Sequence, residues 1–196
     1  MAAAFAVYSS QWLAVIGFLP VIYEQAGVPL AATGLLSAMA AGVNMIGNIA
    51  SGRWLQRGAS PARLVSLGFV LMALAATAAF AAPGGTGLPL EWRYAAVLLF
   101  STAGGVIPAA LFSLAVRLAP GEDMISTTVG WVQQWSAMGQ FAGPPFVSWM
   151  ASRAGGWHWT WVATSSLSLI GLVLAGRIGR RVSQVRSLPS AAARGH

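Results

Sequence analysis

Residues 130–150 read GWVQQWSAMGQFAGPPFVSWM, a stretch that is apolar enough for lipid and yet rich in hydrogen-bonding side chains. Tryptophan, phenylalanine and methionine stand beside three glutamines, Gln133, Gln134 and Gln140. The stretch also contains a Gly-Pro-Pro step at 143–145, which is typical of a helix break. Apolar bulk combined with amides and a prolyl step indicates a membrane span with a polar face.

The composition of the whole chain also indicates a membrane protein. Of its 196 residues, 57% are hydrophobic and 8% are charged, whereas a soluble domain has about 25% charged residues. The formal charge of +7 comes from arginines at the ends of apolar runs, which form no basic face with interleaved aromatics. Nucleic-acid binding is therefore excluded. The lack of cysteine excludes disulfides and thiol-based metal sites.

Six apolar stretches are each long enough to cross a bilayer as a helix, which takes about 20 residues. They cover residues 3–23, 31–51, 63–82, 94–116, 125–150 and 158–177. Turn signals rich in glycine and proline separate them, among them residues 27–29, 83–87 and 120–121. We therefore predict an all-α integral membrane protein with one six-helix domain over 1–180 and a disordered cytoplasmic tail over 181–196.

The arginines predict the orientation of these helices. One end of the expected bundle holds Arg53, Arg57, Arg63, Arg117, Arg177, Arg180, Arg181, Arg186 and Arg194. The other end holds only Arg93 and Arg153. Because the more basic end of a membrane protein faces the cytoplasm, both termini are predicted to be cytoplasmic. Arginine without lysine in an Ala- and Gly-rich chain indicates a GC-rich bacterial genome, so we expect a multi-pass protein of the bacterial inner membrane.

The fifth expected helix divides into two faces at about 100° per residue. One face is small and polar and consists of Gly130, Gln133, Ala137, Gln140, Pro144 and Ser148. The opposite face is bulky and consists of Trp131, Trp135, Met138, Ala142, Phe146 and Trp149. We expect the bulky face to meet lipid and the polar face to meet neighbouring helices. Gln133 and Gln140 are interpreted as lining a solute cavity, with hydrogen bonding between helices as the alternative.

Polar residues on two other expected helices allow the same two interpretations. Tyr8 and Gln11 share a face of the first helix, and Asn44 and Asn48 are four residues apart on the second. Tyr8, Gln11 and Asn44 are added to the candidate cavity, while bonding between helices stays equally open for the asparagines. Proline removes a backbone bond and glycine allows bending or close packing. The residues expected to shape helices in this way are Pro20, Gly104, Gly105, Pro108, Gly143, Pro144 and Pro145.

No acid and no histidine lies deep in an expected span. The acids and histidines stand at helix ends, in loops or at the last residue, and they are Glu24, Glu91, Glu122, Asp123, His158 and His196. This distribution argues against metal-dependent hydrolysis, an intramembrane protease and a proton relay within these spans. We therefore expect no enzyme activity, no catalytic residue, no metal and no cofactor.

Four segments carry a resemblance to a known family. Residues 47–65, GNIASGRWLQRGASPARLV, resemble the cytoplasmic Gly-x-x-x-Asp-Arg-x-Gly-Arg loop of the major facilitator superfamily. Gly52 and Arg57 match that motif, Gln56 takes the place of its aspartate, and Gly58 stands one position early. Residues 104–120 and 139–157 resemble the tenth and eleventh helices of the superfamily. Residues 11–27, QWLAVIGFLPVIYEQAG, resemble its seventh helix in the cyanate-transporter-like branch, and the whole likeness covers residues 5–180.

The resemblance implies the C-terminal half, helices 7–12, of a twelve-helix fold in which both halves line a central cavity. The activity it implies is secondary transport of a small polar or anionic organic solute by alternating access, as part of a permease. The implied partners are the lipid bilayer, the solute, and an N-terminal six-helix half or another subunit. The alternative is a truncated fragment or half-length membrane subunit that does not transport and needs a partner half.

Overall fold

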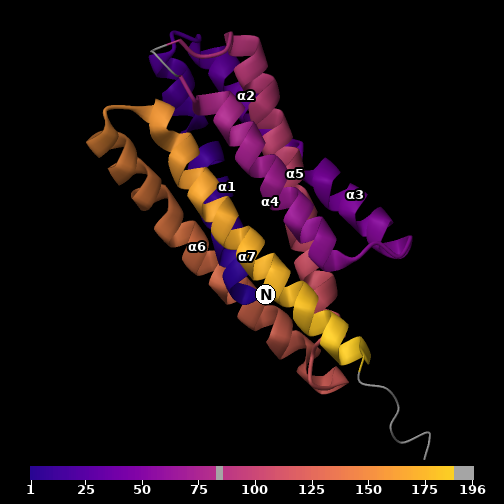
Figure 1. The fold of residues 1–196 in the computed structure, drawn as a ribbon. Helices are drawn as coiled ribbons and strands as arrows, with labels where there is room; N and C mark the ends of the chain where they lie inside the picture. The colour runs from indigo at the N-terminus through magenta and orange to yellow at the C-terminus, as the bar shows by residue number, and fades with distance from the viewer. Residues whose placement is uncertain (83–85, 188–196) are drawn as a thin grey trace, which may run out of the picture.

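The computed structural model describes residues 1–82 and 86–187, and the regular elements in that part of the chain are helices (Figure 1). The α-helices are α1 (Ala2–Gln25), α2 (Leu30–Gly42), α3 (Asn44–Gln56), α4 (Pro61–Phe80), α5 (Leu90–Arg117), α6 (Ile125–Ala154) and α7 (Thr160–Ser187). Single 3-10 turns, Glu122–Met124 and Trp157–Trp159, precede α6 and α7. Each expected span corresponds to one of these helices or, for residues 31–51, to the α2–α3 pair. The all-α prediction is confirmed.

The second expected span consists of two helices, because the backbone hydrogen-bond ladder is interrupted at Val43. The Val43 N–H donates to the Met39 carbonyl at 3.0 Å in the α-helical pattern, whereas the Val43 carbonyl accepts from the Ile46 N–H, only three residues later, also at 3.0 Å. Immediately after the interruption, the Asn44 side chain donates to the Ser101 carbonyl of α5 at 2.8 Å. The interruption thus lies where α3 begins its contact with α5.

The predicted boundary between bundle and tail lies too early, because α7 continues to Ser187. The added turns continue an apolar side of α7: Ile178, just before the predicted boundary, is only 9% exposed, and Val182, one turn later, packs against the hydrophobic core. Burial of that side explains why the chain stays helical beyond residue 180. Residues 188–196 of the predicted tail and residues 83–85 of a predicted turn lie outside the described residues.

The helix break predicted at Gly143-Pro144-Pro145 is absent, and α6 runs through this step without interruption. The two prolines remove two backbone donors, so the carbonyls one turn earlier lose their usual partners. Membrane helices tolerate such a loss where the backbone is packed in protein. Gly143 meets this condition, because it lies against the backbone of Ser10 on α1.

Five helical segments of the described chain are long and apolar enough to cross a membrane. They are α1, the α2–α3 pair, α4, α5 and α7. α6 has sufficient length, but Gln133, Gln134 and Gln140 lower its apolar content. Composition therefore supports five of the six predicted spans. α6 is held in the bundle mainly by its packing on α1.

The helices form two layers. In the first layer α6 packs on α1, α1 contacts α2 and α5, and α3 packs on α5. In the second layer α7 packs on α1 and α4, and α4 also packs on α5. Figure 1 shows α7 and α4 in front of the first layer, with α6 and α3 at its opposite edges. Each edge helix has one main neighbour, which leaves much of its surface uncovered by the described chain.

The hydrophobic core lies between the two layers. Its largest fully buried side chains include Leu19 of α1, Phe69 and Met72 of α4, and Phe100 and Ile107 of α5. Lipid tails are as apolar as these side chains, so close van der Waals contact stabilises the bundle rather than removal of apolar surface from water. The stability of the bundle therefore depends on how closely its helices approach one another.

Glycine permits the closest approach between α1 and α6. Gly139 and Gly143, one turn apart on α6, lie against the α1 backbone at Ala6 and Ser10. A Cβ atom at either glycine would overlap backbone atoms of α1. This contact has the spacing of the small-residue motifs that pack membrane helices, in which two glycines stand four residues apart.

One end of the bundle is rich in arginine. The α3–α4 turn, the end of α5 and the last turns of α7 meet there around a cavity of about 290 Å³. Arginines of these segments are Arg53, Arg57, Arg63, Arg117, Arg177, Arg180 and Arg181. We call this the arginine-rich end. The α1–α2 and α4–α5 connections lie at the opposite end (Figure 1).

Candidate functional site

Two faces of α1 carry different polar contacts. Ser9 and Gln11 are about 200° apart around the helix at about 100° per residue. The Gln11 Oε1 atom accepts a hydrogen bond from Ser168 of α7 at 3.0 Å, whereas the Ser9 hydroxyl is bonded to that of Ser136 on α6 at 2.6 Å. The Ser9 side of α1 therefore faces away from α7. We call the side of the first layer that α7 and α4 do not cover the open face.

A chain of hydrogen bonds leads from the α1–α6 contact toward the open face. Ser136 Oγ, bonded to Ser9, also accepts from Gln140 Nε2 at 3.2 Å. Both serines are buried, whereas Gln140 is exposed. Gln133 lies on the same side of α6, is exposed, and makes no hydrogen bond within the described part of the chain. The free amide of Gln133 and the Gln140 carbonyl oxygen can therefore meet a polar molecule.

α6 packs on α1 through a ridge that lies between its two predicted faces. The buried residues of this ridge are Val132, Ser136, Gly139, Gly143, Val147 and Ala151. The ridge is rotated by roughly 100° from the face that holds Gln133 and Gln140. Within the described chain it is therefore this ridge, and not the small, polar face, that packs on a neighbouring helix. The bulky face lies on the other side of the ridge, where Trp131 is 62% exposed and Trp149 is 57% exposed.

A second polar cluster joins α1, α3 and α5. Asn44 Nδ2 donates to Tyr8 Oη at 3.1 Å and to the Ser101 carbonyl at 2.8 Å, and its Oδ1 accepts from Asn48 at 3.1 Å. Trp12 Nε1 donates to Ser101 Oγ at 3.1 Å. Tyr8 and Ser101 are buried, whereas Asn44, Asn48 and Trp12 are half-buried. Tyr8 and Asn44 thus hold helices together, and Asn48 and Trp12 keep part of their surface free.

Glycines of α5 make room for this cluster. Gly105 lies directly against the backbone of Asn44, and a Cβ atom there would overlap it. A Cβ atom on Gly104 would lie 3.0 Å from the Tyr8 ring. α5 stays helical through Pro108. The glycines predicted to shape α5 therefore serve close packing in this structure.

Gln11 lies away from the open face. It is fully buried between α1 and α7, and its Nε2 has no hydrogen-bond partner in the described chain. It cannot touch a solute at the open face in this conformation, so its place among the cavity candidates is not supported by its position. Pro20 is exposed near the end of α1, which is helical on both sides of it.

The loop motif lies at the arginine-rich end. Gly52 is within α3, Gln56 is the last residue of α3, and Arg57 follows it; both of the latter are exposed. Gly58 has φ of 87°, a left-handed conformation that favours glycine. The N–H groups of residues 58 and 59 bond back to α3 in the pattern of a Schellman motif. This turn explains why a glycine stands at position 58.

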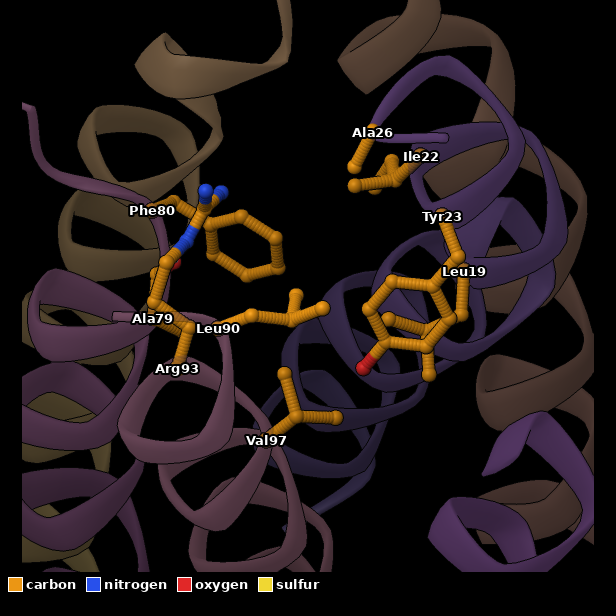
Figure 2. A pocket seen from close by; sticks show the side chains of 9 residues that line it. All are labelled: Leu19, Ile22, Tyr23, Ala26, Ala79, Phe80, Leu90, Arg93 and Val97. Atoms are coloured by element: carbon orange, nitrogen blue, oxygen red, sulfur yellow. The ribbon is translucent and has the colours of Figure 1, made fainter. Parts of the chain in front are cut away.

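A small cavity at the opposite end lies between α1, α4 and α5 (Figure 2). Its volume is about 10 Å³, which is room for about one water molecule. The Tyr23 hydroxyl points into the space between the helices and has no hydrogen-bond partner in the described chain. Arg93 Nε donates instead to the Ala79 carbonyl at 2.7 Å. The cavity is too small for an organic solute.

Several residues that make hydrogen bonds between helices were not singled out from the sequence. They are Ser9, Trp12, Ser101, Ser136 and Ser168. A signal was present for the α1–α6 contact: Gly139 and Gly143 have the spacing of a small-residue packing motif, and Ser136 stands one turn before them. The serines of α1 and α5 carry no comparable signal, because serine is common in membrane helices.

The fold and the open face define the chain as a multi-pass helical membrane protein with neutral polar groups between its helices. A family model described as Major Facilitator Superfamily matches residues 1–195. The chain therefore belongs to the major facilitator superfamily, whose members are transporters and not enzymes. A search of curated proteins found no significant match.

Proposed function

We propose that the chain forms one six-helix half of a secondary transporter that moves a small polar or anionic organic solute by alternating access. The observation that carries this proposal is the series of hydrogen bonds from Ser9 through Ser136 to the exposed Gln140, with the free amide of Gln133 beside it. Polar groups within a membrane are costly and commonly mark a substrate path. An amide both donates and accepts, so it can bind a polar solute from either side.

A second six-helix unit covers the open face in this proposal, either an N-terminal half or a separate subunit. The edge helices support it, because their uncovered surfaces are large and apolar: Phe141 of α6 is 85% exposed and Met45 of α3 is 65% exposed. Such surfaces flank the open face on both sides and suit contact with another helical unit or with lipid. A half-length subunit that does not transport is the rival, and the uptake assay below separates the two.

We further propose that the arginine-rich end faces the cytoplasm of a bacterium and that the protein resides in its inner membrane. The distribution of arginine supports this orientation under the positive-inside rule. The likeness of residues 11–27 to the cyanate-transporter-like branch supports a small organic anion as one class of solute.

Two adjacent glutamines provide the test. In the complete transporter, Gln133→Ala removes an amide from the open-face side of α6, whereas Gln134→Ala alters an exposed neighbour about 100° further around the helix. Loss of a hydrogen bond that leaves a buried partner unpaired costs about 1–3 kcal/mol. We expect solute uptake to fall about 5- to 150-fold for Gln133→Ala at normal membrane abundance. Uptake should be nearly unchanged for Gln134→Ala.

Equal uptake by both variants and the unaltered protein would count against a cavity role for Gln133. Reduced abundance of Gln133→Ala without a loss of uptake per molecule would assign this glutamine to helix packing. A lack of uptake by the unaltered chain paired with its second half would favour the subunit that does not transport.

A further inference from the structure

The cavity at the arginine-rich end is lined by three segments that are far apart in the sequence. The α3–α4 turn contributes residues 58–61, the end of α5 contributes Leu114, Arg117 and Leu118, and α7 contributes Val182. Its volume of about 290 Å³ is close to the lower limit of roughly 300 Å³ for small-molecule sites. The cavity therefore has room for a ligand much larger than water.

The wall of this cavity is divided by chemistry. Leu114, Leu118 and Val182 make one part of it apolar, whereas Arg117 and Ser60 supply polar groups. Ser60 precedes α4 and makes no capping bond with its side chain, so its hydroxyl is available to a ligand. A ligand that suits this wall has a polar group beside an apolar one.

The charges around the cavity are mainly positive. Arg117 lines it directly. The arginines that adjoin the lining segments in the chain are Arg57, Arg63 and Arg181. The acids that follow α5, Glu122 and Asp123, belong to the 3-10 turn that leads to α6 and do not line the cavity. The cavity therefore favours an anion.

The cavity also lies where the apolar helices end. α4 begins at Pro61 and α5 ends at Arg117, and both residues line the cavity. The ends of membrane-spanning helices meet the headgroup layer of a bilayer. Guanidinium groups bind phosphate through two parallel hydrogen bonds, and basic pockets between membrane helices bind anionic headgroups. We infer that this cavity binds the phosphate of an anionic phospholipid, with the start of the acyl chains against Leu114 and Leu118.

The amount of phospholipid that the protein retains tests this binding site directly. The full chain is placed in nanodiscs of phosphatidylcholine with one-fifth phosphatidylglycerol, and bound lipid is counted by native mass spectrometry. Loss of a charge-assisted bond should reduce retained phosphatidylglycerol about tenfold or more in Arg117→Gln. Arg63→Gln removes the same charge at the same end from a residue that does not line the cavity. That control should change retention at most about fivefold, the general effect of one arginine near an anionic surface.

A second variant separates shape from charge. Ala59 lines the cavity, so Ala59→Leu should narrow it and reduce retention while every arginine stays in place. Thermal unfolding in pure phosphatidylcholine confirms that each variant is folded. Equal losses in the Arg117 and Arg63 variants, or normal retention in Ala59→Leu, would overturn the site. Stabilisation by soluble glycerol 3-phosphate, without preference for phosphatidylglycerol, would show that the cavity binds a free phosphate ester and would overturn the lipid assignment.

Discussion

Replacement of Gly139 by alanine should loosen the contact between α1 and α6. An added Cβ atom would lie 2.8 Å from the carbonyl carbon of Ala6 and 2.9 Å from its Cα, whereas carbon atoms in contact are about 3.5–4.0 Å apart. The clash is with backbone, so α6 must move away by roughly 1 Å. Overpacking of this kind costs about 1–3 kcal/mol.

The same movement weakens the bond between Ser9 and Ser136, which is 2.6 Å long in the structure. Hydrogen bonds between membrane helices contribute about 0.6 kcal/mol on average. Alanine regains up to about 1 kcal/mol of helix propensity over glycine. We therefore expect Gly139→Ala to be less stable by about 1–3 kcal/mol, which lowers the melting temperature by roughly 2–12 °C.

Gly130→Ala is the matched control on the same helix. Nothing lies within 4 Å of the position its Cβ atom would take, so only the gain in helix propensity applies and the melting temperature should stay level or rise. Thermal unfolding of the chain in lipid nanodiscs measures both variants. If Gly139→Ala melted as high as Gly130→Ala, the α1–α6 contact would not depend on glycine and the packing argument would fail.

Three further predictions concern orientation, the second polar cluster and ion coupling. Reporter fusions after Arg57 should be cytoplasmic and fusions after Gly87 periplasmic; the reverse result would contradict the orientation. Asn44→Ala should lower the melting temperature more than Asn48→Ala, because Asn44 donates to both α1 and α5 while Asn48 bonds only within α3. Equal melting temperatures of the two variants would argue against a stabilising role of the Asn44 bonds to α1 and α5. If uptake is driven by protons, substitutions within these helices should leave the pH dependence of uptake intact, since no acid or histidine lies deep in a span. A substitution within these helices that abolished the pH dependence would contradict this prediction.

The class of the protein and the positions of its helices follow from local sequence. Apolar length and arginine placement are properties of single segments, so they can be evaluated without knowledge of neighbours. The interruption at Val43 is different, because it accompanies the bond between Asn44 and Ser101, residues that are 57 positions apart. No local pattern contains that partner.

The rotation of α6 shows a second limit of sequence reasoning. Hydrophobic periodicity correctly separates a face with Gln133 from a face with Trp131, but it does not show which surface packs on another helix. In lipid, an apolar residue gains little by burial, so hydrophobicity does not mark the packed side. The packed side is marked instead by small residues such as Ser136 and Gly139, which allow the backbones to approach.

The pairing of α1 with α6 has a consequence for the order in which the protein is made. Their bonded serines, Ser9 and Ser136, are separated by 127 residues. At a synthesis rate of 5–20 residues per second, the first helix waits roughly 6–25 s for its partner. α6 is the helix least suited to enter lipid alone, since its glutamines lower its apolar content. Its insertion therefore depends on the surface that α1 already offers in the bilayer, and a nascent chain without α1 should leave α6 outside the membrane.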